Sequence, residues 1–112
     1  MMDCLFCKIE KGEIPSPRVY EDELFFVIRD INPRAKIHLL AIPKGHVETI
    51  GDAKNVGEIM NRIGAHYTEW GLEKGYRVII NQGSDGGQEV PHLHIHLLGG
   101  EKLGENIRCN KK

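Results

Sequence analysis

Short hydrophobic segments separated by turn-forming residues make up most of this chain. β-Branched and aromatic residues favour strands, whereas glycine, proline, asparagine and aspartate favour turns. Asn32-Pro33 marks one turn, and Pro43 with Gly45 ends another hydrophobic segment. The pattern therefore predicts five strands, at residues 19–21, 24–30, 38–42, 76–81 and 93–98.

One amphipathic helix is predicted over residues 53–70. Hydrophobic residues recur there at spacings of three and four, as on one face of an α-helix: Val56, Ile59, Met60, Ile63, Tyr67 and Trp70. Asp52 is the predicted N-cap, and Gly71 suits the C-terminal end of the helix. Strands joined by short turns and interrupted by one long helix indicate an α+β fold with a mostly antiparallel sheet.

The length and the charge of the chain limit its possible roles. With 112 residues it has room for one domain, and we expect residues 1–112 to form it. Lys plus Arg number 15 and Asp plus Glu 16, so the formal net charge is 15 − 16 = −1. This balance argues against a nucleic-acid partner or a membrane surface, although a single nucleotide is compatible with it.

No hydrophobic run approaches the ~18 residues that suggest a transmembrane helix. The longest uncharged apolar runs are residues 24–28 and 39–42. The N-terminus has neither the basic region nor the apolar region of a signal peptide. We therefore expect a cytoplasmic protein that does not bind membranes.

The most informative motif is the alternation of His92, His94 and His96 with apolar residues. Alternate side chains of a strand share a face, so the three histidines are expected on one side. The intervening residues, Leu93, Ile95 and Leu97, are expected in the core. Neighbouring histidines would be roughly 6.6 Å apart at Cα, from a rise of ~3.3 Å per residue.

A glycine-rich segment, Asn81 to Gln88, precedes the histidines. Its glycines at positions 83, 86 and 87 allow backbone N–H groups to turn inward, which suits a phosphate. Anion donors beside imidazoles make phosphate binding or phosphoryl transfer plausible.

Cys4 and Cys7 have the C-x-x-C spacing of metal ligands, and a redox pair is the competing interpretation. The chain holds three cysteines, the third being Cys109. Two cysteines alone do not complete a tetrahedral zinc site, so histidines would have to supply the other ligands. The candidates are His38, His46, His66 and the three alternating histidines.

These motifs together resemble the histidine triad (HIT) family, and in particular its Hint-like nucleoside phosphoramidase branch of the zinc-binding bacterial type. The signature is His92-Leu-His94-Ile-His96-Leu-Leu98, and the resemblance covers nearly the whole chain. Further matching segments are 6–9, 13–15, 20–22, 30–33, 38–46, 75–77 and 81–100. The resemblance implies a five-stranded antiparallel sheet with one long helix and a short N-terminal helix. It also implies a homodimer in which the two sheets continue into one another.

The implied activity is hydrolysis of purine nucleoside phosphoramidates, in which AMP or GMP is joined to an amine. His94 corresponds to the nucleophile that forms a nucleotidyl-histidine intermediate, and His96 assists catalysis. The implied nucleotide-binding residues are Phe6, Ile14, Asp30, Ile31, Asn81, Gly87, Gln88, Glu89, His94 and His96.

This chain carries Glu89 at a position where many relatives carry serine or threonine. A carboxylate beside a phosphate repels it, so Glu89 is a poor phosphate ligand. The alternative partner for the Glu89 carboxylate, in place of the phosphate, is a basic leaving group.

Relatives that begin with Cys-x-x-Cys bind zinc, and the resemblance implies Cys4, Cys7, His46 and His92 as ligands. Four protein ligands leave no open position, which makes this one structural zinc ion per chain. The ion would hold residues 1–12, whereas residues 103–112 are expected to form a mobile tail.

Three other functions compete with phosphoramidate hydrolysis. In a metal-dependent hydrolase the three histidines would hold one catalytic ion, although the outer two would be about 13 Å apart at Cα. Dinucleoside polyphosphate hydrolases share the triad. A nucleotide sensor or scaffold with little turnover is the third possibility.

Overall fold

The computed structural model describes residues 4–105. They form the helices α1 (Leu5–Glu10), α2 (Val56–His66) and the 3₁₀ helix η1 (Tyr67–Trp70). The strands are β1 (Tyr20–Glu21), β2 (Phe25–Arg29), β3 (Ile37–Pro43), β4 (Tyr76–Ile79) and β5 (Ile95–Gly99). Cys109, most of the tail predicted at 103–112 and residues 1–3 lie outside the described part. Within that part, no helix is long and apolar enough to cross a membrane.

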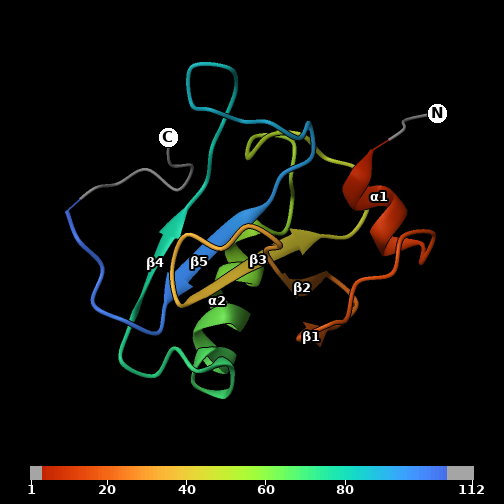
Figure 1. Ribbon diagram of the computed structural model, residues 1–112. Helices are drawn as coiled ribbons and strands as arrows, with labels where there is room; N and C mark the ends of the chain where they lie inside the picture. Colours follow the sequence, from red (N-terminus) through yellow and green to blue (C-terminus); the bar gives the residue numbers. More distant parts are fainter. Residues whose placement is uncertain (1–3, 106–112) are drawn as a thin grey trace.

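The predicted α+β fold with a five-stranded antiparallel sheet is confirmed. The strand order is β1-β2-β3-β5-β4, and every neighbouring pair is antiparallel. Figure 1 shows α2 lying against the sheet, while α1 stands to one side near the end of β3. β3 and β5 occupy the middle of the sheet, so residues on both strands are flanked by neighbours on each side.

Each face of the sheet carries its own hydrophobic cluster. On the α2 side, strand residues such as Val27, Leu39 and Ile95 pack with Ile59 and Ile63 of the helix. On the α1 side, Phe26, Ile28, Leu40 and Ile42 pack with Phe6 and Ile9. Fully burying one such side chain stabilises the fold by about 1.5–3 kcal/mol. The second cluster therefore holds a helix of only six residues against the sheet.

Arg18 adds polar contacts that fix the end of α1. Its guanidinium donates to the carbonyl oxygens of Ser16 (2.7 Å) and Ile9 (2.8 Å). The same group lies 4.6 Å above the ring centre of Phe26, a cation–π contact with the sheet. The predicted short N-terminal helix is thus anchored at its C-terminal end as well as along its apolar side.

The long helix begins later than predicted. Its N-cap is Asn55, not Asp52, because Asp52 closes a separate turn with Thr49. The α-helical part ends at His66 and continues as η1 to Trp70. Gly71 ends this segment in the left-handed conformation, with φ of 85°, as its position predicted.

The last strand also begins later than predicted, at Ile95 instead of residue 93. Pro91 has no backbone N–H for a strand ladder. The N–H of His92 donates to Val90 O, and that of Leu93 donates to Val47 O in the segment after β3. His92 and His94 consequently stand just before the strand, held by a neighbouring loop, and only His96 lies within β5.

Candidate functional site

A pocket of about 300 Å³ opens on the α1 side of the sheet. One part of its wall is apolar and comes from α1, the segment after it and the sheet, with Phe6, Ile14 and Leu40 as examples. Its polar wall includes Asp30, His38, Asn81, His94 and His96. Apolar lining with a few convergent polar groups is typical of a small-molecule site.

The structure brings nearly all the predicted nucleotide-binding residues together. The pocket is lined by Phe6, Ile14, Asp30, Ile31, Asn81, Gly87, Glu89, His94 and His96. Ile31 lies at the surface, with 92% of its area exposed. Gln88 does not line the pocket. Its amide instead bonds Gly83 N, Glu48 O and Val90 O, so it braces the loop.

His94 is held with one ring nitrogen occupied. Its Nδ1 lies 2.8 Å from the carbonyl oxygen of His92. A carbonyl oxygen only accepts, so Nδ1 carries the proton and Nε2 keeps its lone pair. The ring packs against Phe6 of α1, with centroids 5.0 Å apart. His94 therefore presents a fixed, unprotonated nitrogen, as a nucleophile requires.

His38 fixes the opposite arrangement at His96. The backbone N–H of Arg34 donates to His38 Nδ1 at 3.0 Å, so the proton of a neutral His38 is on Nε2. This Nε2 lies 2.9 Å from His96 Nδ1, which accepts the hydrogen bond. His96 consequently carries its own proton on Nε2. One histidine of the pocket thus offers a lone pair and the next offers an N–H donor.

Sequence reasoning placed His38 only among possible metal ligands and missed this role. In the sheet register His38 pairs with Leu98 and Leu40 pairs with His96, which makes His38 the diagonal neighbour of His96 on the same face. The only sequence signal for this role was a histidine at the start of an apolar strand. The contact between His38 and His96 could be recognised only from the register of β3 against β5.

Burial keeps these histidines neutral at pH 7. It lowers the pKa of His94 below its ordinary value of 6.5, although the bond to His92 O and the charges of Asp30 and Glu89 act in the other direction. Burial, together with His94 and His38, lowers the pKa of His96 to about 4. Burial is also the main reason that the pKa of His38 is lowered.

The glycine-rich loop is rigidly bonded next to the histidines. Asn81 Nδ2 donates to Gly86 O at 2.8 Å, and Gly87 N and Gln88 N donate back to Ser84 O and Gly83 O. At Gly86 an added Cβ would lie 2.3 Å from Gln82 O, so only glycine fits there. The loop is therefore a closed turn that holds Asn81, Gly87 and Glu89 at the pocket.

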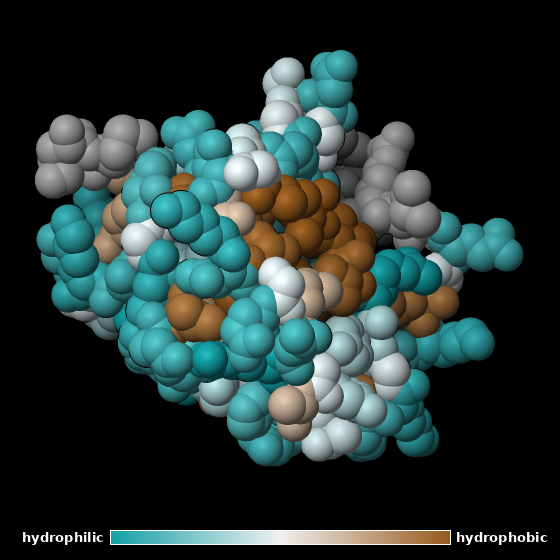
Figure 2. All heavy atoms as spheres, turned by 180° about the vertical axis from the view of Figure 1, so that it is seen from behind, coloured by the Kyte–Doolittle hydropathy of each residue, from teal (hydrophilic) through white to brown (hydrophobic). Residues whose placement is uncertain are grey.

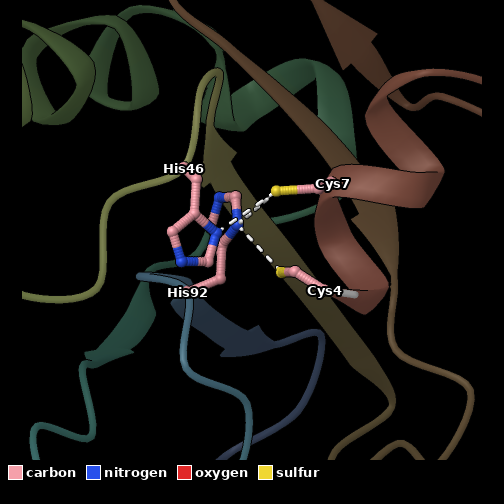
Figure 3. Close-up of side chains that lie close together, drawn as sticks. All are labelled: Cys4, Cys7, His46 and His92. Atoms are coloured by element: carbon pink, nitrogen blue, oxygen red, sulfur yellow. Dashed lines mark hydrogen bonds between the residues drawn. The ribbon is translucent and has the colours of Figure 1, made fainter. Parts of the chain in front are cut away.

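A second cluster, formed by Cys4, Cys7, His46 and His92, lies beside the pocket (Figure 3). The cysteines come from the start of α1, His46 follows β3, and His92 precedes β5. The sulfur-to-Nδ1 distances are 3.3 Å for Cys4–His92, 3.2 Å for Cys7–His46 and 3.6 Å for Cys7–His92. Tetrahedral zinc with bonds of ~2.3 Å to sulfur and ~2.0–2.1 Å to nitrogen separates these atoms by roughly 3.5 Å. The four residues therefore fit a metal ion.

The other ring nitrogens of this cluster also suit metal ligands. His92 Nε2 lies 3.2 Å from Pro43 O and must donate to it, which leaves Nδ1 to coordinate. His46 Nε2 lies 3.5 Å from a carboxylate oxygen of Glu48. Metal-bound histidines usually donate their second N–H, as His92 does here, whereas His46 Nε2 is buried and has no hydrogen-bond partner among the described residues. His66, another candidate ligand from the sequence, lies away from this cluster on α2, beside Tyr20 and Glu69.

The three alternating histidines do not converge on one ion. His92 turns to the cysteines, His94 to the pocket and His96 to His38. Asp30, His38 and His96 do lie close enough together to share an ion. However, Arg34 N–H occupies His38 Nδ1, and the proton this places on Nε2 blocks coordination by that nitrogen. The arrangement does not support a catalytic metal at either place.

The HIT domain family matches residues 11–103. Among solved structures, a HIT family hydrolase from Legionella pneumophila is 45% identical with a TM-score of 0.81, covering 92% of this chain and 97% of that one. A histidine triad nucleotide-binding protein from Candida albicans is 30% identical with a TM-score of 0.81, covering 98% and 86%. A zinc-bound histidine triad family protein from Mycobacterium smegmatis is 30% identical with a TM-score of 0.76, covering 99% and 85%.

Proposed function

This chain belongs to the HIT domain family, and from that premise we propose that it hydrolyses the P–N bond of purine nucleoside phosphoramidates. The observation that carries the proposal is the pair of opposite tautomers in the pocket. His94 keeps a lone pair on Nε2, and His96 keeps a proton on Nε2. That pair provides a nucleophile and a hydrogen-bond donor for one phosphoryl group.

The reaction proceeds in two displacements at phosphorus. Nε2 of His94 attacks, the P–N bond breaks, and its electron pair leaves with the nitrogen, which takes up protons from solvent to depart as the ammonium ion; the water that attacks next returns two protons to solvent. His94 then carries the nucleotidyl group, and its Nδ1–H remains bonded to His92 O, which stabilises the positive ring. Water attacks phosphorus next and releases His94. Overall, phosphoramidate monoanion and water give a nucleoside monophosphate dianion and an ammonium ion, so atoms and charge balance.

The remaining pocket residues bind the nucleotide. Phe6, Ile14 and Ile31 form the apolar slot for the base, and Asp30 accepts hydrogen bonds from the ribose hydroxyls. Asn81 and the backbone at Gly87 bind the phosphate, and His96 Nε2–H donates to it. Gln88 contributes by holding the loop and not as a direct ligand.

Cys4, Cys7, His46 and His92 hold one structural zinc ion. The fit of the donor atoms and the second hydrogen bond of His92 support this assignment. Bound zinc supplies a cross-link between α1, the segment after β3 and the residue that orients His94. Thiolate ligands persist in a reducing compartment, so we assign the protein to the cytoplasm.

We further propose that residues 1–112 are one HIT domain that forms a homodimer, in which two sheets join edge to edge. Among residues 4–105, β4 pairs only with β5, so its outer edge is open. Val78 on this strand is 36% exposed, and Ile50 is 43% exposed beside Gln82, to which its N–H is bonded. Figure 2 shows an apolar area on the face of the molecule opposite to the view of Figure 1.

The decisive assay measures AMP release from adenosine 5′-phosphoramidate. The native protein is expected to release AMP, and His94→Ala is expected to lose at least about a thousandfold of the rate, because no other group replaces a nucleophile. His66→Ala, at a half-buried helix position outside the pocket, is the matched control and retains activity. AMP release by His94→Ala at the native rate would overturn the proposal.

Two further candidates give different outcomes in the same assay. A folded native protein that leaves the phosphoramidate intact but cleaves a dinucleoside polyphosphate would be a polyphosphate hydrolase. A folded protein that binds AMP without cleaving either compound would be a nucleotide sensor or scaffold. The tautomer pair favours a hydrolase over a sensor, because it supplies a neutral nucleophile, and the choice of substrate in the assay separates the two hydrolases.

A further inference from the structure

Cys4 and Cys7 are close enough to react with each other. Neither is in a disulfide, and their sulfur atoms belong to a cluster whose ligand atoms all lie within 4.8 Å of one another. A disulfide holds its sulfurs about 2.05 Å apart, and Cys-x-x-Cys is the spacing of dithiols that form one. The pair can therefore close by a local shift of the chain, without bringing distant segments together.

The two cysteines differ in their exposure to solvent. Cys4 is buried, with 3% of its area exposed, whereas Cys7 is half-buried. Figure 3 shows both sulfurs facing the two histidines of the cluster, so each lies beside the other's partners. A small oxidant reaches Cys7 first and finds Cys4 next to it. An accessible sulfur beside a second, resolving cysteine is the usual arrangement of a redox-sensing site.

The segment that carries the cysteines also supports the proposed nucleotide pocket. Phe6, between them in sequence, is buried, and its ring centroid lies 5.8 Å from that of His92 and 5.0 Å from that of His94. His92, whose Nδ1 faces Cys4, accepts the Nδ1 proton of His94 at its carbonyl oxygen. A change at the two sulfurs therefore reaches the proposed nucleophile through Phe6 and through His92.

We propose that Cys4 and Cys7 are a site of reversible oxidation, at which a peroxide forms a disulfide between them, releases the bound zinc and slows the reaction at His94. The disulfide itself needs neither the metal nor the substrate. The release step rests on the proposed zinc site, and the slowed reaction rests on the proposed phosphoramidase function. Disulfides in a reducing compartment are usually transient and redox-sensing, which is the behaviour assigned to this pair.

The oxidation consumes one peroxide molecule per chain. The Cys7 thiolate attacks a peroxide oxygen, the O–O bond breaks, and a sulfenic acid and a hydroxide ion form. The Cys4 thiolate then attacks the Cys7 sulfur and displaces a second hydroxide ion, which completes the S–S bond. The two sulfurs lose two electrons and the peroxide gains them. Only His46 and His92 then remain of the four ligands, too few for tetrahedral zinc.

Hydrogen peroxide added to the zinc-loaded Cys109→Ser variant tests the proposal, because Cys4 and Cys7 are then the only cysteines of the chain. Trypsin leaves both in the peptide of residues 1–8, which mass spectrometry should find lighter by two hydrogen atoms. A zinc-binding dye should detect one ion released per disulfide. AMP release should slow by roughly tenfold to a hundredfold, because a misplacement of about 1 Å can cost that much. Dithiothreitol with zinc should restore it.

Two further variants separate the thiol chemistry from the loss of metal. His46→Ala keeps both thiols and lacks one ligand, so it should form the same disulfide at lower peroxide concentration, because no metal occupies the sulfurs. Cys4→Ser keeps the more accessible sulfur and removes its partner, so it should form sulfenic and sulfinic acids at Cys7 and no disulfide within the peptide. The native chain should give the same linkage as Cys109→Ser.

Several results would overturn the proposal. They are two free thiols after peroxide treatment, a Cys7 sulfinic acid without a disulfide, a disulfide that includes Cys109 in the native chain, and a Cys4–Cys7 disulfide with the zinc retained. A protein that takes up no zinc before oxidation would overturn the release step.

Failure of the proposed phosphoramidase function is recognised separately, because the peptide mass and the metal release are measured without substrate. If the reduced protein cleaves no phosphoramidate, calorimetric binding of AMP replaces the rate, and oxidation should weaken it. An unchanged rate, or equal AMP affinity in the reduced and oxidised forms, would overturn the link between the two sulfurs and the pocket.

Discussion

Backbone hydrogen bonds decide which ring nitrogen carries the proton at each histidine of the site. His92 O takes the proton of His94 Nδ1, Pro43 O takes that of His92 Nε2, and Arg34 N–H excludes a proton from His38 Nδ1. These partners are themselves fixed by strand ends and turns, so the tautomers are set before any ligand binds. The three histidines of the motif, although chemically identical, thereby have three different surroundings: the cysteines, the pocket and His38.

At the residue scale, the burial of His96 predicts a loss of stability in acid. The folded pKa is about 4 and the ordinary value is 6.5, so between these pH values the unfolded chain binds a proton that the folded chain does not. The free energy of unfolding should therefore fall as pH falls from 6.5 to 4, by on the order of 3 kcal/mol from this residue. Urea unfolding at several pH values measures it.

His96→Gln is the control for that titration, because the other buried histidines and any bound metal remain. Over the same pH range, the free energy of unfolding of the variant should fall less steeply than that of the native protein. The difference between the two slopes should correspond to about one proton taken up on unfolding. Parallel pH profiles for the two proteins would contradict the buried neutral state of His96.

At the scale of single elements, α1 is short and depends on what it contacts. Helices of this length are marginal on their own, so packing and cross-links must hold it. Phe6 lies between the two cysteines in sequence and contacts both His92 and His94, with ring centroids 5.8 and 5.0 Å away. The helix α1 thus contributes both to the wall of the pocket and to the cluster of Cys4, Cys7, His46 and His92.

Chelation of the proposed zinc should therefore loosen α1 before the rest of the fold. We expect faster amide hydrogen exchange in Leu5–Glu10 after chelation, while Val56–His66 in α2 stays protected. The melting temperature should fall by at least about 10 °C. Cys7→Ser should reproduce both effects without a chelator. Purified protein with no bound metal and no response to chelation would contradict the zinc assignment.

The helix α2 offers a test of the fold that leaves the site untouched. Gly64 lies inside it on the exposed side, and an added Cβ meets no atom within 4 Å. Gly64→Ala should therefore raise the free energy of unfolding by about 0.5–1 kcal/mol, the cost of glycine in a helix. Thermal unfolding measures the change. A destabilised variant would mean that this side of α2 is covered in solution.

Element by element, the sequence predicts much of the fold and less of the site. Hydrophobic periodicity locates the five strands and α2, because it reflects which side chains must be buried. It places the start of the last strand two residues early, since the bond from Leu93 to Val47 is a long-range contact. It leaves several histidines open as partners of Cys4 and Cys7, and only the fold brings His46 and His92 to them. The resemblance to the HIT family, unlike the hydrophobic pattern, had already indicated these two histidines.

At the scale of the whole molecule, the feature that matters most is the outer edge of β4, which pairs with no other strand in the described part of the chain. Exposed strand edges tend to pair, and the proposed homodimer would cover this one. Light scattering should give a mass twice that of the 12.7 kDa chain. Val78→Asp on β4 should give monomers, whereas Ile31→Asp at the pocket mouth should remain dimeric. A monomeric native protein would contradict the edge-to-edge dimer.

The central claim is that His94 becomes covalently linked to the nucleotide during turnover. Rapid alkaline quenching of the native protein with adenosine 5′-phosphoramidate, followed by peptide mass spectrometry, tests it directly. We predict one adenylyl group on His94 at early times, disappearing as AMP accumulates, and none in His94→Ala. AMP formation with no adduct at any time, or with the adduct on another residue, would contradict the account.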